Sequence, residues 1–238
     1  MPFVDDARRS SSDVPTAREA AFAAVKAWKQ TGAFLSKTLE RLPPIIDPAE
    51  RRLTQELAYG VVRRQATLDA LLASCVSRPR ERIEDDLWTL LQLGAYQLTF
   101  LEGIPPHAAV HATVELARFL GQPRWVGFAN AVLRKSADLL TSDLVASFAA
   151  DAVPLADRQY RRLRAPALPD PKQSPAEYVA AAFSLPLWLV QRWIKDVSID
   201  ELVARGFWFN ATPPIWLRVN RLKSTRDELL RSLASSGI

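Results

Sequence analysis

The sequence predicts a mainly α-helical protein: a helical bundle over the first 140 residues, then a linker and a short segment that combines helices with one strand. Helix start signals recur, and apolar residues follow them at helical spacing. No alternating strand pattern appears before about residue 210. Apolar stripes of this kind can cover one another, so residues 15–140 are expected to form a compact bundle.

The first two helices are predicted from their end signals. Thr16 with Glu19 makes a capping box, and Gly32 is expected to end the helix that follows. The apolar face of this helix carries Ala21, Val25 and Trp28. A second, short helix is expected to end at the two prolines at 43–44. Its apolar stripe consists of Leu35, Leu39 and Leu42.

A long helix is predicted to begin at Asp47. Asp47 suits the N-cap, Pro48 the first helical position, and Glu50 the positive end of the helix dipole. A helix that continues to Leu71 would be unusually long, so we expect a bend or break, with Gly60 as the candidate place.

Three further helices complete the predicted bundle. The first spans Asp85 to Leu101, and its Gly94 would let another helix approach closely. A stop at 103–106 and a break at 121–123 separate the next two stripes. Their apolar residues are Val110, Val114 and Ala117, then Val126, Val132, Leu133, Ala137 and Leu140.

The composition changes after residue 140. Residues 151–175 hold five prolines and a basic run without an apolar period: Arg158, Arg161, Arg162 and Arg164. We therefore predict a Pro-rich linker over 141–182 with room for short helical turns. Residues 1–14 are expected to form a flexible basic tail.

Helical signals resume at Ser184 and again at Ser198, which forms a second capping box with Glu201. The range 215–220 alternates as a strand does, and Thr225 caps a final helix. A lone strand leaves its backbone groups unpaired, and nothing follows Ile238 to pair with it. The expectation is a chain that stops inside a fold whose remaining strands are missing.

Composition narrows the class of protein. No stretch approaches the roughly 18 apolar residues of a membrane span, and the first residues lack a signal peptide, so a cytoplasmic protein is expected. The single cysteine, Cys75, excludes an internal disulfide and any multi-cysteine zinc site. The net charge of +5 and a pI near 9.6 are compatible with a polyanionic partner without requiring one.

Three phrases resemble the NusB-like RNA-binding domain: Leu-Ala-Tyr-Gly-Val-Val-Arg-Arg at 57–64, Leu-Gly-Ala-Tyr-Gln-Leu at 93–98 followed by Ile-Pro-Pro at 104–106, and Phe-Ala-Asn-Ala-Val-Leu-Arg-Lys at 128–135. The phrases at 184–189 and 213–220 carry a second resemblance. Through them, residues 183–238 resemble the segment that leads into the methyltransferase part of the Sun (RsmB-type) ribosomal RNA cytosine-5 methyltransferases. The resemblance implies the RNA-binding N-terminal region of such an enzyme, truncated before its catalytic domain.

In that family a Rossmann-like domain with a glycine-rich loop binds S-adenosylmethionine, and two cysteines act on the pyrimidine. The eight glycines here include no Gly-x-Gly pair, and Cys75 lies in the helical domain, where a packing role is expected. No catalytic residue is carried over. No cofactor or metal is expected in this chain, and S-adenosylmethionine only if a catalytic domain follows.

The basic residues give the candidate RNA contacts. Arg18, with Arg8 and Arg9 before it, resembles the N-terminal basic motif of NusB-like domains, although a solvated helix face is equally open. Ion pairing with Asp69 or Glu56 is the preferred alternative for the arginines at 63–64. The candidate RNA-binding set is Arg18, Lys26, Lys29, Arg63, Arg64, Arg134 and Lys135.

Several polar residues near these candidates have predicted structural roles. Asn130 is expected to make a helix–helix hydrogen bond, and Gln92 stands where arginine is common in the family. The spacing of His107, His111 and Glu115 could bind a metal, but a solvated polar face is favoured because no further ligand lies nearby.

Two other groups favour structural roles. The acidic pair at 85–86 is expected to complement a helix N-terminus. Trp28 and Trp193 lie on apolar stripes, which favours core packing over base stacking.

Three functions stay open at this point. The leading one is the RNA-docking region of a ribosomal RNA cytosine-5 methyltransferase. A stand-alone antitermination module like NusB, acting through RNA and a ribosomal protein, is the alternative, against which the phrase at 217–220 argues. A degenerate remnant without an RNA role is the third, and the intact apolar periodicity argues against it.

Overall fold

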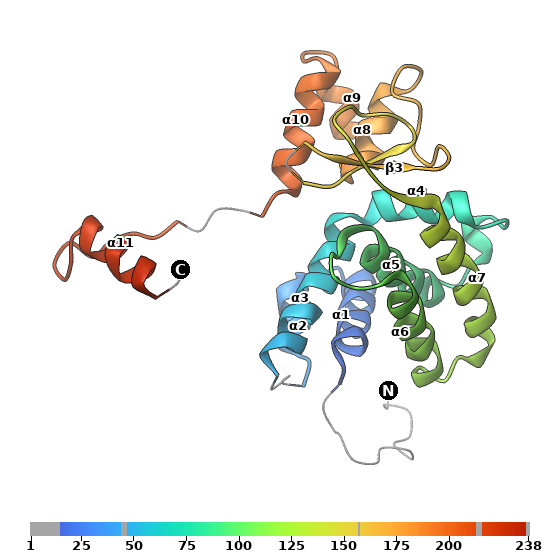
Figure 1. The fold of residues 1–238 in the computed structure, drawn as a ribbon, viewed down its shortest axis with the longest axis horizontal. Helices are drawn as coiled ribbons and strands as arrows, with labels where there is room; N and C mark the ends of the chain where they lie inside the picture. The colour runs from blue at the N-terminus through green and yellow to red at the C-terminus, as the bar shows by residue number, and fades with distance from the viewer. Residues whose placement is uncertain (1–14, 44–46, 157, 213–215, 237–238) are drawn as a thin grey trace.

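The computed structural model describes residues 15–43, 47–156, 158–212 and 216–236. Over these residues the chain is mainly α-helical, as predicted. A lower body of helices is joined to a smaller upper body that contains a three-stranded sheet (Figure 1). The lower body consists of α1 (Ala17–Thr31), α2 (Leu35–Glu40), α3 (Pro48–Arg63), α4 (Gln65–Cys75), the 3-10 turn η1 (Arg80–Arg82), α5 (Asp85–Phe100), α6 (Pro106–Phe119) and α7 (Pro123–Leu139).

The predicted end signals form as expected. The hydroxyl of Thr16 accepts from the N–H of Glu19, and the Glu19 carboxylate accepts from the N–H of Thr16, which completes the capping box. Gly32 ends α1 in the left-handed conformation, with φ of 65°. Asp47 caps α3 and Pro48 takes its first position. Local sequence therefore determines where α1 and α3 begin.

The expected break at Gly60 is wrong in position. Helix α3 passes through Gly60 to Arg63, and the chain leaves helical geometry at Arg64, with φ of −106° and ψ of 18°. Gly60 has a different role, because the ring of Tyr96 packs against it from α5. A glycine at a helix contact and a glycine at a helix break look the same in one sequence.

Helix α5 is the centre of the bundle. It contacts α1, α3, α4, α6 and α7, and nearly all of its residues are buried. Gly94 allows α7 to approach, as predicted, since a Cβ there would lie 2.6 Å from Cδ2 of Leu133. Trp28 packs against this core from α1, which confirms its assignment to packing.

The upper body corrects the predicted linker over 141–182. It contains β1 (Leu140–Val145), β2 (Ala152–Pro154) and β3 (Tyr160–Leu163), antiparallel in the order β1-β3-β2, followed by α8 (Pro175–Phe183). In β3 only Tyr160 and Leu163 are fully buried, and the two arginines between them interrupt the apolar pattern. Short strands of this kind carry little periodic signal.

Two helices complete the upper body: α9 (Leu187–Trp193) and α10 (Ile199–Asn210). Ser184, predicted as a helix start, instead ends α8 with φ of 55°. Ser198 caps α10, but Glu201 bonds Arg205 rather than returning the second half of a capping box. Trp193 packs against this core as predicted.

The two bodies are held together through α4 and α8. The hydroxyl of Thr67 lies within hydrogen-bonding distance of the carbonyl groups of Ala181 and Ala182, and its backbone N–H donates to the hydroxyl of Ser184 at 3.1 Å. Thr67 is fully buried, so these bonds are shielded from water.

The last described segment differs from its prediction. Of the predicted strand at 215–220, Ile215 lies outside the described residues, and 216–220 form no strand because no neighbouring strand pairs with them in the described part of the chain. Helix α11 (Arg226–Ser235) begins with the predicted capping box at Thr225, has no buried residue and stands apart from both bodies (Figure 1). No helix in the described ranges is long and apolar enough to cross a bilayer.

Candidate nucleic-acid interface

Two basic residues of α1, Arg18 and Lys26, are half-buried and make contact with α5. The Nε of Arg18 donates to Oε1 of Gln97 at 2.8 Å, and burial lowers the pKa of Arg18. Nζ of Lys26 lies 2.6 Å from Oδ2 of Asp86, with both side chains about one-third exposed. Each residue therefore already has a partner inside the protein, while part of each side chain stays accessible.

Lys29 is more deeply engaged. Its ammonium group donates to Thr89 at 2.9 Å and to Oε1 of Gln92 at 2.7 Å, and burial lowers its pKa. Gln92 in turn donates to Asp69 at 2.6 Å. Gln92 is thus the middle of a polar chain between α1 and α4, and the ammonium group of Lys29 has partners within the protein at one end of that chain.

Arg64 connects the two bodies. Its guanidinium group donates to the carbonyl oxygens of Leu155 at 2.8 Å and Pro154 at 3.4 Å, and lies 4.9 Å from the ring centroid of Phe100. Burial lowers the pKa of Arg64 to about 10, which leaves it charged at neutral pH. Only 7% of Arg64 is exposed, so it is not available to a nucleic acid.

The ion pairs predicted for Arg63 and Arg64 are absent from the described structure. Glu56 accepts from the hydroxyl of Tyr96 at 2.6 Å, and Asp69 accepts from Gln92 and from an indole N–H. The preference for a structural role was right for Arg64, but backbone carbonyl groups replace the expected carboxylates.

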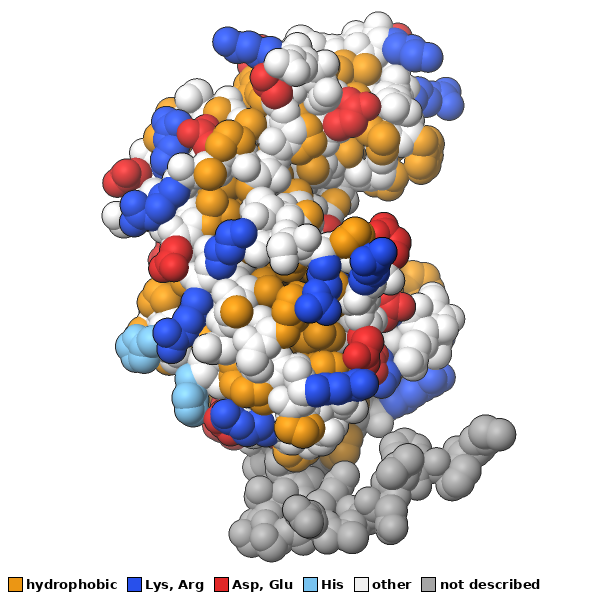
Figure 2. All heavy atoms as spheres, turned by 90° about the vertical axis from the view of Figure 1, so that its right-hand side faces the viewer, with side chains coloured by type: hydrophobic (Ala, Val, Ile, Leu, Met, Phe, Trp, Pro, Cys, Tyr) orange, Lys and Arg blue, Asp and Glu red, His pale blue; other side chains and the backbone are white. Residues whose placement is uncertain are grey.

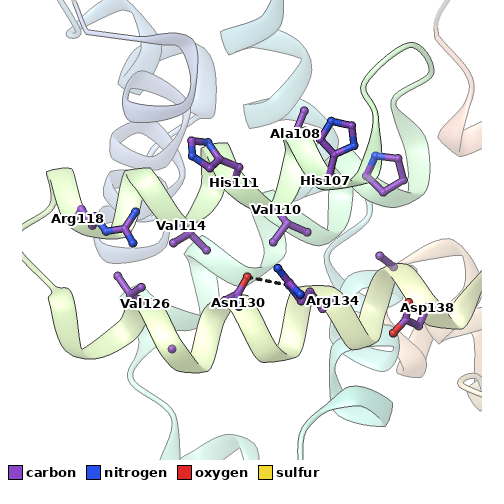
Figure 3. A pocket seen from close by; sticks show the side chains of 13 residues that line it. His107, Ala108, Val110, His111, Val114, Arg118, Val126, Asn130, Arg134 and Asp138 are labelled. Carbon is purple, nitrogen blue, oxygen red and sulfur yellow. Dashed lines mark hydrogen bonds between the residues drawn. The ribbon is translucent and has the colours of Figure 1, made fainter.

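A groove of about 970 Å³ runs between α6 and α7 (Figure 3). Val110, Val114 and Val126 form its apolar floor, and the rim carries His107, His111, Arg118, Arg134 and Asp138. Lys135, next along α7, is exposed but does not line this groove. On the face shown in Figure 2, basic side chains are interspersed with acidic ones, so no single charge dominates it.

Several polar residues of the groove have partners on their own helix. Nε of Arg134 donates to Oδ1 of Asn130 at 3.2 Å within α7, so the predicted helix–helix bond of Asn130 is wrong. Nε2 of His111 lies 3.7 Å from Glu115, which also pairs with Arg118. Among the described residues no cluster of three or more potential ligands could hold a metal ion.

The residues of this chain do not fit S-adenosylmethionine. Neighbouring side chains fill the space beside the Cα atoms of Gly60, Gly94 and Gly206. The other described glycines lie in turns or within α7, so none forms a loop between a strand and a helix. Cys75 is buried at the end of α4, beside Ser74. A cradle for the methyl donor and an accessible thiol are both missing from the described part.

The outer face of α3 carries Arg63, which the sequence analysis named as a candidate RNA contact, and two residues that it did not name, Arg52 and Tyr59. Arg52, Tyr59 and Arg63 are exposed on one side of the helix, at positions i, i+7 and i+11. They line a cleft of about 550 Å³ together with Thr212. Their spacing complements the buried stripe of Leu57 and Val61, and this signal could have identified them.

A second cleft, of about 470 Å³, adjoins the first at the C-terminal end of α3. Arg63 and Glu56 line both clefts, and here Arg161 of β3 and Glu102 join them. The guanidinium group of Arg161 donates to the carbonyl oxygens at the end of α5, while its buried Nε has no acceptor in the described structure.

Comparison with known proteins gives two matched segments. Residues 15–138 match the NusB family, and residues 185–238 match a domain described as Methyltr_RsmF/B-like, ferredoxin-like. The chain is 34% identical over 221 residues to ribosomal RNA small subunit methyltransferase B of Pseudomonas putida, covering 93% of this chain and 44% of that protein. It is 32% identical over 204 residues to the probable methyltransferase B of Synechocystis, covering 86% and 40%. The chain thus spans less than half the length of these relatives.

Proposed function

Because this chain belongs to the NusB family, we propose that it docks RNA for a ribosomal RNA cytosine-5 methyltransferase. The order of its segments carries the proposal: a NusB domain is followed by a ferredoxin-like domain of the RsmF/B type. A stand-alone antitermination module does not account for the second segment. In this proposal the protein works in the cytoplasm, with ribosomal RNA as its partner.

The accessible basic residues supply the first contacts. Arg134 and Lys135 are exposed on α7, and neither has an ion pair among the described residues. Arg18 and Lys26 offer the accessible parts of their side chains at the edge of α1. Guanidinium and ammonium groups at such positions bind phosphates without reading bases, so they would orient the RNA rather than select its sequence.

The chemistry of methyl transfer lies outside the residues described here. S-adenosylmethionine supplies the methyl group in this type of reaction, and the described ranges offer neither a cradle for it nor an accessible thiol. Its contribution would be to hold the RNA so that the cytosine is presented elsewhere.

The test is a binding measurement with labelled small-subunit ribosomal RNA fragments. We expect micromolar affinity that falls at least about tenfold as salt rises severalfold. The variant Arg134→Ala with Lys135→Ala should weaken binding. Its matched control removes two exposed charges elsewhere, at Arg82 and Lys172. Affinity no greater than for a duplex DNA of equal length would contradict a role in docking RNA.

A further inference from the structure

The strongest unexplained feature is the outer face of α3. Along one side of it two arginines flank an aromatic ring: Arg52, Tyr59 and Arg63 are all exposed, and the carboxylate of Glu56 lies between the first two. Tyr59 is 39% exposed, although it lies between two cations and adjoins an apolar helix face. Positions seven and eleven residues apart lie within about 20° of one direction, so these side chains form a line about 16 Å long.

The carboxylate of Glu56 offsets part of the charge along this line, but the arginines outnumber the carboxylates. Neither Arg52, Arg63 nor Arg161 has an ion pair among the described residues. The carboxylate of Glu56, which lies between the arginines on α3, is occupied by the hydroxyl of Tyr96. Glu102 is the other carboxylate of the two clefts. Because the buried guanidinium of Arg64 adds its charge from below, the clefts are positive overall.

The geometry of the clefts suits an extended ligand. They share Glu56, Gly60, Arg63 and Thr212, so they form one continuous path along α3 toward the sheet. We call this path, from Arg52 to Arg161, the α3 surface. A chain with regularly spaced negative charges and flat apolar groups matches a line of alternating cations and an aromatic ring.

We propose that the α3 surface holds an unpaired stretch of the RNA, with Arg52 and Arg63 on phosphates and Tyr59 stacked on a base. This inference rests on the proposed function and names the part of the protein that would receive single-stranded RNA. A paired helix could place phosphates on the arginines but could not use the phenol ring, because its bases are already stacked on one another. Tyrosine and arginine are also enriched at protein interfaces, so the choice of RNA over a protein partner rests on the proposed function and on the spacing of the cations around the ring, and the affinity measurements below test it.

The decisive experiment compares two RNAs of equal length, one unpaired and one fully paired, on the full chain. Replacing Arg52 and Arg63 together by alanine should lower affinity for the unpaired RNA about tenfold. The slope of log affinity against log salt should fall by about 0.7 for each lost phosphate contact. The control variant Arg82→Ala with Lys172→Ala removes the same charge and should keep both affinity and slope near wild type.

Variants at Tyr59 distinguish the contribution of base stacking to RNA affinity from that of charge. Tyr59→Leu should reduce affinity for the unpaired RNA by about tenfold and leave the paired RNA nearly unaffected, whereas Tyr59→Phe keeps the ring and should bind as wild type. All three positions are exposed, and thermal melts followed by circular dichroism check that each variant folds as wild type does.

The outcomes distinguish the two proposals. A wild-type chain that binds neither RNA overturns the proposed function. A wild-type chain that binds RNA, with affinity lost in the α7 variant but unchanged in the Arg52, Tyr59 and Arg63 variants, leaves the function in place and overturns the α3 surface. Equal losses for Tyr59→Leu and Tyr59→Phe would also overturn the stacking contact.

Discussion

Tyr96 of α5 lies directly against Gly60 of α3: a Cβ atom on Gly60 would stand 2.0 Å from Cζ of the tyrosine ring. The missing side chain lets the ring pass over α3, so that its hydroxyl reaches Glu56 at 2.6 Å, one turn earlier on the same helix. This contact fixes α3 against the central helix and leaves the exposed side of α3 facing the two clefts.

Gly60→Ala should therefore destabilise the fold. The added methyl group must displace a packed ring, and overpacking of this kind costs about 1–3 kcal/mol. Urea unfolding of the two proteins measures the difference. Gly127→Ala is the matched control, since a Cβ at that helical position meets open space and should stabilise the protein by about 0.5–1 kcal/mol. Equal stability of Gly60→Ala and wild type would contradict this role of the glycine.

Arg64→Met should loosen the upper body from the bundle. The substitution leaves the carbonyl groups of Pro154 and Leu155 without their donor, and each buried acceptor that loses its partner costs about 1–3 kcal/mol. We expect a lower free energy of unfolding and faster hydrogen exchange at the amides of 152–163. The neighbouring Arg63→Met removes an equal charge from an exposed side chain and should change neither quantity. Unchanged exchange in Arg64→Met would show that other contacts hold the two bodies together.

Helix ends could be predicted because their signals are local. The Thr16 and Thr225 capping boxes and the glycine at 32 each act within a few residues of the end that they define. The sheet could not be predicted, because Arg161 and Arg162 interrupt β3. Their guanidinium groups bond the carbonyl oxygens of α5 and the side chain of Asp151, partners that alternation along one strand does not reveal.

The same distinction applies to the candidate site. The sequence identified Lys29 and Arg64 as basic residues on helices, but their surroundings come from residues about 60 and 90 positions away. Gln92 and the carbonyl of Leu155 each accept a hydrogen bond from one of these residues, and neither partner can be found from the local sequence. The α3 surface is hidden in the sequence for the converse reason: Arg52 lies outside the family-like phrase at 57–64 and Tyr59 inside it, and only the folded helix shows both exposed on one side with Arg63.

Stability should fall steeply above pH 10. Burial, as the largest cause, raises the pKa of Tyr96, Tyr160 and Tyr178, and the hydrogen bond to Glu56 raises that of Tyr96 further. The unfolded chain releases these phenol protons near pH 10 while the folded chain retains them, so the folded state binds more protons and loses stability as pH rises. Each tyrosine contributes up to about 1.4 kcal/mol per pH unit in that range.

Absorbance at 295 nm against pH checks this expectation. The three buried phenols should ionise only together with loss of the helical signal in circular dichroism, and Tyr178→Phe should make the fall in stability less steep. Full ionisation of all tyrosines in a protein that stays folded would contradict the assignment of these rings to the core.

Residues 1–238 should neither bind S-adenosylmethionine nor transfer a methyl group. Addition to carbon 6 of a cytosine needs a thiolate that can reach the ring, and the one cysteine of the chain is 6% exposed within the helical bundle. Calorimetry with the donor should show no binding heat, and a tritiated methyl-transfer assay on ribosomal RNA should give no more counts than Cys75→Ser gives. That variant is the sharp control: if the wild-type chain turned over and Cys75→Ser did not, the nucleophile would lie in the helical domain. Opening of α4 would then be required to expose it, because Cys75 packs in the same core as the central helix.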